Sequence, residues 1–279
     1  MIIDTHQHFW RGRVPAYDKW MTGRLQGLSG RHMPEDLAPE LVAAGVTATV
    51  AVQSWGSVEE THEYLRIADT HEWVVGVVGW LDLTAPSFTE DLDALRGGRH
   101  GEWLRGIRHT VDLDERPEWF SRPDVRTALR TLGDFALAYD LLVRPNYLVS
   151  AAEAVEACPG TQFVLDHCGK PPVGDSLDNW KRGIEGLSRH PNVACKLSGL
   201  LTLSPTESSS DNLRPIVDEI LQAFGPERVM FGSDWPVSSC VANYSDVTAQ
   251  TTALIDDLSP VEKAGVLSAN AQRVYKLLA

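Results

Sequence analysis

Short runs of apolar residues recur along the chain, and longer amphipathic segments separate them. Several of these runs are rich in Val and Ile and nearly continuous in hydrophobicity, which is typical of strands buried on both faces of a parallel sheet. Eight runs fit this description. They predict strands at Ile2–Asp4, Val46–Gln53, Val74–Asp82, Leu104–His109, Phe135–Arg144, Gln162–His167, Val193–Ser198 and Arg228–Asp234.

The segments between these runs carry helix-start signals. A serine followed three residues later by glutamate is the capping-box pattern, which predicts a helix N-terminus. It occurs at Ser57, Ser87, Ser150 and Ser259. Strand–helix alternation repeated eight times predicts the α/β class and one (β/α)₈ TIM barrel, a single domain over residues 1–279. A doubly wound open sheet is the alternative, but no Gly-x-Gly-x-x-Gly follows the first run.

Two segments depart from this alternation. The first, Phe9–Met33, is too long for a simple turn and contains Trp10, Tyr17 and Trp20. A loop of this length is usually functional or a lid, and the sequence leaves open which of the two applies. The second, Ser204–Asp211, is polar and rich in serine, and we expect it to be mobile.

Composition narrows the classes of partner. The chain has 279 residues, 43% of them hydrophobic, which suffices for a sizeable core, and its formal net charge of −13 argues against binding a nucleic acid backbone. The four cysteines form no Cys-x-x-Cys pair, and no signal peptide or membrane-spanning stretch is apparent. We therefore expect a cytoplasmic protein with a small-molecule substrate and no membrane partner. The oligomeric state stays open.

Polar residues of catalytic type stand at the ends of the predicted strands. His6 and His8 follow the first strand two residues apart, so their side chains point to the same face. His167 ends the sixth strand and Asp234 ends the eighth. Active sites of (β/α)₈ barrels lie at the C-terminal ends of the strands, and the first and eighth strands are neighbours. The sequence therefore predicts three imidazoles and one carboxylate in a single pocket.

Several longer stretches of the sequence match motifs of a known protein family. They are Ile3–Trp10, Gly76–Asp82, Gly106–His109, Val164–Pro171, Lys196–Gly199, Phe231–Val237 and the pair Asn270-Ala271 followed by Tyr275. In combination they resemble the amidohydrolase superfamily, and within it the amidohydrolase 2 group. That group includes sugar lactonases of the L-fuconolactonase and L-rhamnonolactonase type. The resemblance runs from the first residues of the chain to the last.

The resemblance implies a hydrolase of carbohydrate catabolism that opens an aldonolactone, such as L-fuconolactone or L-rhamnonolactone, by attack of water. Asp234 would be the general base, and it would later return the proton to the leaving alkoxide. His6, His8 and His167 would polarise the carbonyl group or orient the water. These four residues are the expected catalytic set.

The resemblance also leaves other activities open. A metal-dependent decarboxylase of the same superfamily shares the histidines and the aspartate of the eighth strand. A lactonase acting on an aromatic-derived dicarboxylate would need several cations around the pocket, whereas His109–Glu115 is acidic, which favours a neutral lactone. A sugar-binding protein without enzymatic activity would have no use for the histidine and aspartate set.

The metal content follows from the same comparison. Many members of the superfamily place a lysine at the end of strand four or a histidine at the end of strand five. Here these ends read Arg108-His109 and Val143-Arg144-Pro145, so a binuclear centre lacks ligands. One divalent ion, zinc by its ligand chemistry, would be held by His6, His8 and Asp234, with His167 as a further partner. A site without metal is the alternative.

The remaining site predictions concern the substrate. The expected substrate-binding residues are Arg108, Gln53, Arg144, Trp80 and Trp235. Arg108 and His109 cannot both face inward on a regular strand, and the family pattern favours Arg108. Lys196 is expected either in the pocket or in a layer of the barrel. Lys170 is expected to stabilise the loop after the sixth strand.

Overall fold

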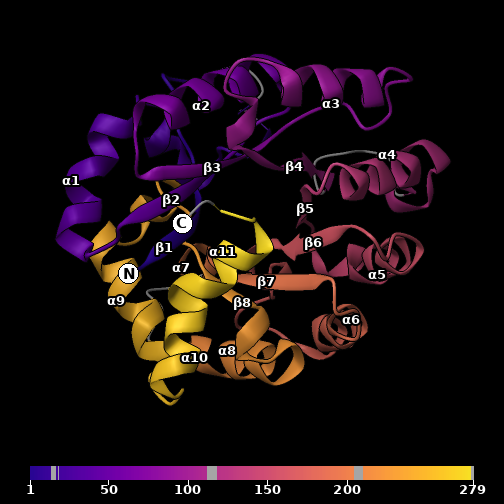
Figure 1. Ribbon diagram of the computed structural model, residues 1–279. Coiled ribbons are helices and arrows are strands. Elements are labelled where there is room, and N and C mark those ends of the chain that lie inside the picture. The colour runs from indigo at the N-terminus through magenta and orange to yellow at the C-terminus, as the bar shows by residue number, and fades with distance from the viewer. Residues whose placement is uncertain (14–16, 18, 112–117, 204–209, 278–279) are drawn as a thin grey trace.

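The computed structural model describes residues 1–13, 17, 19–111, 118–203 and 210–277. Eight parallel strands form one sheet in chain order, and helices surround it (Figure 1). The strands are β1 (Ile3–Gln7), β2 (Ala48–Val52), β3 (Val74–Gly79), β4 (Leu104–Thr110), β5 (Ala138–Leu142), β6 (Gln162–Leu165), β7 (Val193–Leu197) and β8 (Val229–Phe231). The predicted (β/α)₈ barrel is confirmed.

The α-helices alternate with the strands along the chain. They are α1 (Pro34–Ala44), α2 (Val58–Thr70), α3 (Phe88–Gly97), α4 (Pro123–Asp134), α5 (Leu148–Ala157), α6 (Asp178–Ser188), α7 (Leu200–Leu203), α8 (Ser210–Phe224), α9 (Tyr244–Leu254), α10 (Pro260–Ala264) and α11 (Asn270–Val274). Short 3₁₀ segments connect several of them, including η2 (Gly23–Leu28), η7 (Asp166–Gly169) and η9 (Val237–Cys240). Among the helices that the structure describes, none has the length and apolarity needed to cross a membrane.

The helix starts test the capping-box predictions one by one. Ser57 and Ser259 are confirmed as N-caps, since their side chains accept hydrogen bonds from the backbone N–H groups three residues later. Ser87 precedes α3 but makes no capping bond. Its backbone (φ −88°, ψ 9°) is not extended as that of an N-cap usually is, and its hydroxyl donates to Asp91. The prediction at Ser150 is wrong: this residue lies inside α5, and its hydroxyl donates to a carbonyl of the preceding turn.

The first and last strands close the barrel through bonds near their C-terminal ends. Thr5 Oγ1 donates to the Phe231 carbonyl at 2.6 Å, and the Asp234 N–H donates to the His6 carbonyl at 2.8 Å. Directly beyond this pair, the N–H of His8 donates to the carbonyl of Trp235 at 2.8 Å. β1 is longer than predicted and includes His6, because these closing bonds extend the pairing beyond the apolar run.

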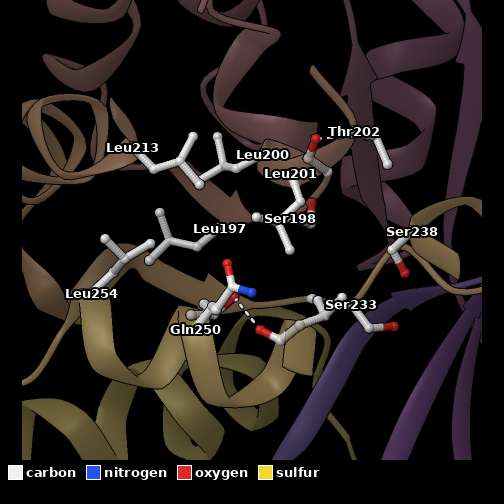
Figure 2. Close-up of a pocket in the computed structure, with 14 residues that line it drawn as sticks. Leu197, Ser198, Leu200, Leu201, Thr202, Leu213, Ser233, Ser238, Gln250 and Leu254 are labelled. Carbon is white, nitrogen blue, oxygen red and sulfur yellow. Dashed lines mark hydrogen bonds between the residues drawn. The ribbon is translucent and has the colours of Figure 1, made fainter. Parts of the chain in front are cut away.

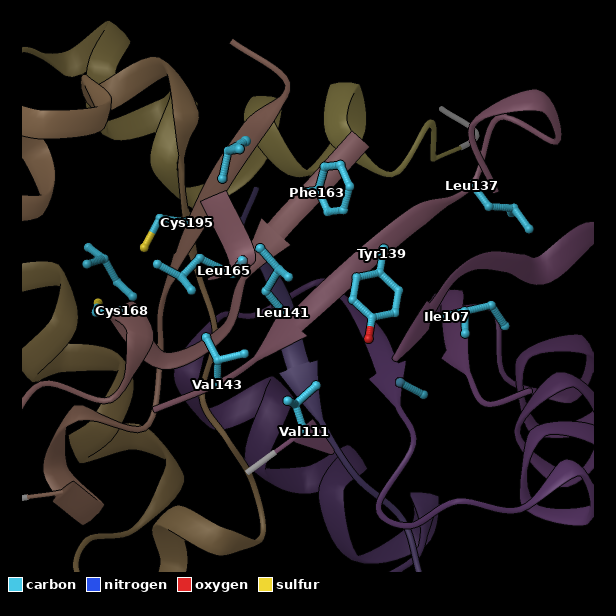
Figure 3. Close-up of a cluster of buried hydrophobic side chains, with 14 of the residues drawn as sticks. Ile107, Val111, Leu137, Tyr139, Leu141, Val143, Phe163, Leu165, Cys168 and Cys195 are labelled. Carbon is cyan, nitrogen blue, oxygen red and sulfur yellow. The ribbon is translucent and has the colours of Figure 1, made fainter. Parts of the chain in front are cut away.

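Side chains alternate between the barrel lumen and the outer layer of helices. On β5, Tyr139 and Leu141 point outward into the large apolar cluster beneath the helices, part of which is shown in Figure 3. Asp140 lies between them and therefore points into the lumen. On β7 the same alternation directs Lys196 inward. The period-2 pattern thus places charged residues in the middle of the barrel.

Two loop predictions have different outcomes. The described part of Phe9–Met33 packs against the barrel, and Trp10, Tyr17, Met21 and Leu28 form a small buried cluster of their own. The predicted mobility of Ser204–Asp211 falls mainly on residues 204–209, which lie outside the described residues.

Candidate active site

A cavity of about 310 Å³ opens at the C-terminal ends of the strands. Its wall combines residues that follow the strands with residues of the long loop after β1. They are His8, Lys19, Trp20, Thr22, Arg24, Leu25, Ser54, Arg108, Thr110, Leu142, Arg144, His167, Lys170, Gly199, Thr202, Leu203, Asp234 and Val237. The cavity therefore lies where the sequence predicts the active site of a (β/α)₈ barrel.

The four residues of the expected catalytic set lie together at the base of this cavity: His8, His167 and Asp234 line it, and His6 is fully buried in contact with their side chains. Asp234 Oδ1 is 3.4 Å from His8 Nε2 and 3.9 Å from His6 Nε2. The ring of His6 lies 4.9 Å from that of His8 and 4.4 Å from that of His167, measured between centroids. All four are buried. His6 lies on β1 and His8 directly after it, whereas His167 lies in η7, beyond the end of β6, and Asp234 lies three residues beyond the end of β8, so both of these strands are shorter than predicted. Their catalytic roles stay predictions.

The backbone around two of these residues is unusual. His167 and Asp234 have φ angles of 52° and 61°, in the left-handed region that non-glycine residues rarely adopt. Bonds to neighbouring strands hold both: Ser198 Oγ lies 2.9 Å from His167 Nδ1, and the Asp234 N–H bonds the His6 carbonyl. Such strain concentrates at functional sites, where the surrounding structure maintains it.

Gly199 makes room for these two side chains. Its φ angle is +65°, and a Cβ atom at this position would lie 2.7 Å from His167 Nδ1 and 3.3 Å from Asp234 Oδ2. The glycine that follows β7 is therefore required twice, once for its backbone conformation and once for the close approach of His167.

Electrostatics fix the protonation states at the floor. Burial by itself would raise the pKa of Asp234, but the neighbouring His167, His8 and Arg108 hold that pKa below its usual value. Burial lowers the pKa of His167 to about 4 despite the attraction of Asp234. At neutral pH the site therefore presents an ionised carboxylate beside a neutral imidazole, which are the states needed to accept a proton from water.

A buried network of charges supports His6 from below. Asp166 Oδ1 lies 3.2 Å from His6 Nδ1 and 3.0 Å from Lys196 Nζ. Lys196 Nζ also donates to Asp140 Oδ2 at 2.6 Å, and the Tyr275 hydroxyl donates to the same carboxylate. Burial raises the pKa of Asp140 to about 6, although Lys196 opposes this shift. Lys196 thus belongs to a layer of the barrel.

Arg108 joins this network to the cavity. Its Nη1 atom lies 3.1 Å from His6 Nε2 and 3.0 Å from Asp166 Oδ2, and its Nη2 atom donates to the carbonyl of Gln53. His109 points the other way, and its ring stacks on Trp119 with 4.1 Å between centroids. The structure confirms that Arg108 is the inward residue of this pair.

The other expected substrate-binding residues are placed differently. Arg144 lines the cavity. Gln53 is fully buried, and its amide donates to the Arg108 carbonyl at 3.3 Å. Trp80 bonds His109 and Trp235 packs against Phe9, so neither ring is among the cavity-lining residues. The ring of Trp235 is buried, and Trp80 is half-buried outside the cavity.

An aromatic ring does line the cavity, but it is that of Trp20, in the long loop after β1, and not that of Trp80 or Trp235. Lys170 also lines the cavity, in addition to its expected role in the loop after β6. Sequence reasoning did not single out Asp166, Ser198 or Ser54. Asp166 and Ser198 lie inside the motif stretches Val164–Pro171 and Lys196–Gly199, and this membership was the available signal.

Ser54 reaches the cavity from the end of β2, and a buried carboxylate holds it. Ser54 Oγ donates to Glu60, whose other oxygen accepts the Ser54 N–H at 2.9 Å. Tyr17 Oη lies 2.9 Å from Ser54 Oγ and so ties the long loop to this contact. Burial raises the pKa of Glu60 to about 7, against the lowering effect of these hydrogen bonds.

A second cavity, of only about 20 Å³, lies behind Ser198, on the side of β7 that faces α8 and α9 (Figure 2). A volume of this size holds about one water molecule. The Ser238 hydroxyl lines it, is buried, and has no hydrogen-bond partner within the described residues. This cavity is too small for a substrate.

Among the residues that the structure describes, one group of side chains has the geometry to hold a metal ion. His6, His167 and Asp234 each offer one ligand atom, these atoms lie within 4.8 Å of one another, and all three residues are buried. We refer to them as the candidate metal group. The donor set of two imidazoles and a carboxylate suits zinc. His8, an expected ligand, lies outside this group, although its Nε2 atom is 3.4 Å from Asp234.

Comparison with known proteins adds to this description. A family model described as Amidohydrolase matches residues 3–277. The chain is 32% identical to an L-fucono-1,5-lactonase of Burkholderia ambifaria, with 99% of this chain and 95% of that protein covered. It is 33% identical to an L-fucono-1,5-lactonase of Burkholderia multivorans, covering 99% and 96% of the two chains.

A solved structure gives the same result in three dimensions. The crystal structure of an amidohydrolase from Burkholderia multivorans, with bound zinc, superposes with a TM-score of 0.94. Its sequence is 32% identical, and the alignment covers 100% of both chains.

Proposed function

The chain belongs to the amidohydrolase family, and on this premise we propose that it is a lactonase that opens a sugar-derived lactone by hydrolysis, an aldonolactone such as L-fuconolactone or L-rhamnonolactone. The observation that carries the proposal is the position of Asp234, an ionised carboxylate next to two histidines at the floor of a cavity large enough for a monosaccharide lactone. The names of the relatives support the same substrate class.

In the proposed reaction a water molecule attacks the lactone carbonyl, and Asp234 accepts one of its protons as general base. The tetrahedral intermediate then collapses, and the bond between the former carbonyl carbon and the ring oxygen breaks. Asp234 returns the proton to the leaving alkoxide, which becomes a hydroxyl group. The product is the open-chain hydroxy acid, and its carboxyl group releases a proton to solvent.

The residues around Asp234 divide the remaining tasks. His8 lies on the cavity wall, 3.4 Å from Asp234, where it orients the attacking water. Arg108, fixed by Asp166, supplies positive charge near the negative charge that develops on the carbonyl oxygen. His167 is neutral and held by Ser198, so it can hydrogen-bond the water or the substrate without competing for the proton.

The candidate metal group fits a single zinc ion. A metal held there would act as a Lewis acid on the lactone carbonyl. The proton transfers proposed for Asp234 are carried out by its own carboxylate and do not depend on a metal ion.

A second substrate class is favoured by the charge of the cavity wall. Five cationic side chains line it, whereas Asp234 is the sole acidic one among the lining residues that the structure describes; the cations are Lys19, Arg24, Arg108, Arg144 and Lys170. The expectation of a neutral lactone rested on the acidic stretch His109–Glu115, of which residues 112–115 lie outside the described residues. A lactone that carries carboxylate groups is therefore the second candidate.

Both substrate classes are tested with one screen. Each hydrolysis releases a proton, so a pH indicator reports turnover of a panel that contains neutral aldonolactones and a dicarboxylate lactone. We expect turnover of at least one aldonolactone and its loss in Asp234→Asn. Turnover of the dicarboxylate alone would favour the second candidate, and no turnover of any lactone would contradict the proposal.

A further inference from the structure

The contact between Arg108 and His6 constrains the chemistry of the imidazole. Arg108 Nη1 lies 3.1 Å from His6 Nε2, and both groups are buried. A guanidinium has five donor hydrogens and no acceptor, so it forms this hydrogen bond only with a nitrogen that carries a lone pair. The contact, at the shorter of the two distances from His6 to a cationic side chain, therefore requires the lone pair of Nε2.

The proton of the neutral ring must then be on the other nitrogen. His6 Nδ1 lies 3.2 Å from the carboxylate of Asp166, whose negative charge attracts that proton. Lys196 Nζ lies 3.3 Å from the same nitrogen, which is longer than its hydrogen bond to Asp140 at 2.6 Å and its ion pair with Asp166 at 3.0 Å. With the proton on Nδ1, Lys196 keeps these two carboxylates as its partners. His6 Nδ1 thus has its partner inside the barrel, and Nε2 is the nitrogen that faces Asp234, at 3.9 Å.

A metal ion in the candidate metal group would need the lone pair of the same Nε2 atom, because imidazole binds a metal through an unprotonated ring nitrogen. One in-plane lone pair cannot be shared between a guanidinium and a metal. We propose that Arg108 and a divalent metal ion compete for His6 Nε2, so that Arg108 weakens metal binding at this site.

Other hydrogen bonds of Arg108 oppose its displacement by a metal ion. Its Nη1 atom also donates to Asp166 Oδ2 at 3.0 Å, and Nη2 donates to the carbonyl of Gln53. A metal that enters therefore has to break or rearrange these bonds as well as the bond to His6. The guanidinium of Arg108 and the metal ion are both cations. The hydrogen bonds to Asp166 and to the Gln53 carbonyl hold the guanidinium in place.

The test is a zinc titration of the purified full chain, freed of metal beforehand, in competition with a chromophoric chelator. Arg108→Met removes both the hydrogen bonds and the charge, and Arg108→Gln removes the charge but keeps a polar side chain. Each variant should lower the Kd for zinc by at least about tenfold, because a hydrogen bond to a charged group contributes at least that factor.

Arg144→Met is the matched control. Arg144 lines the same cavity, and no hydrogen bond joins it to His6 within the described residues, so this variant removes a charge without freeing the lone pair. Its Kd for zinc should change less than threefold. An unchanged Kd in both Arg108 variants, or an equal gain in Arg144→Met, would overturn the proposal.

A crystal structure of the wild-type chain with zinc gives an independent measurement, which also applies if the variants do not fold. The proposal requires that the Arg108 guanidinium be beyond hydrogen-bond distance of His6 Nε2 when zinc is bound. Zinc bound by the candidate metal group with the Arg108 contact intact would contradict it.

Discussion

The backbone N–H of Asp234 donates to the carbonyl of His6 at 2.8 Å, so a bond that closes the barrel also sets the distance between the candidate base and the first histidine. Neither side chain takes part in this bond. The two residues are separated by nearly the whole chain, and only closure of the sheet makes them neighbours. Substitutions of either side chain should therefore leave the barrel closed, which makes the site suitable for mutagenesis.

Asp234→Asn keeps the size of the side chain and removes its ability to accept a proton. Loss of a positioned general base lowers the rate by about 10²- to 10⁴-fold. We expect kcat on the preferred lactone to fall by at least the lower of these factors, with a much smaller change in KM. Steady-state kinetics of the purified variant measure both. A kcat near that of the wild type would exclude Asp234 as the base and make His167 the leading candidate.

Gly199→Ala should reduce kcat as well as stability, because the new Cβ would meet His167 Nδ1 at 2.7 Å. Gly45→Ala is the matched control: Gly45 also has a positive φ, of 70°, but nothing lies within 4 Å of a Cβ there. Both variants carry the left-handed strain of about 1–2 kcal/mol. Only Gly199→Ala should lose activity. Equal kcat values for the two variants would show that the approach of Gly199 to His167 has no catalytic importance.

Lys196→Met should destabilise the fold strongly, since it leaves the carboxylate of Asp140 buried without its ionic partner. Removal of one member of a buried ion pair typically costs about 3–5 kcal/mol. Urea unfolding measures the loss. The control is Lys181→Met, which breaks the more exposed pair with Glu219 and should cost less than about 1 kcal/mol. Asp140→Asn in the Lys196→Met background should recover part of the stability.

Glu60 makes stability depend on pH in a defined direction. Burial raises the pKa of this carboxyl from 4.5 to about 7, so between these values the unfolded chain is ionised while the folded chain holds the proton. The free energy of unfolding should therefore fall as pH rises through this window, by about 2–3 kcal/mol relative to Glu60→Gln. Denaturant unfolding at several pH values measures the difference.

The exposed Glu153→Gln is the control for this comparison, and its curve should run parallel to that of the wild type. Parallel curves for wild type and Glu60→Gln would mean that Glu60 ionises as it would in the unfolded chain. The hydrogen bonds that Glu60 accepts from Ser54 and Trp55 then outweigh its burial.

By itself the sequence determined the barrel, the end of the barrel that carries the site, and the gathering of His6, His8, His167 and Asp234. These follow from local patterns: apolar runs of strand length repeat eight times, and strand order in a parallel barrel places the C-terminal ends at one mouth. The inward direction of Arg108 followed in the same way, from alternation along a strand combined with the family motif.

Only the tertiary structure decided which polar residues meet across the lumen. Asp140 and Lys196 come from β5 and β7, and Asp166 from the 3₁₀ turn that follows β6. Their pairing depends on register and on the distance across the barrel, which no local pattern encodes. The loops show the same limit. Trp235 is buried and Trp80 is half-buried outside the cavity, whereas Trp20 lines it, because the packing of the loops over the barrel sets which aromatic ring faces the cavity.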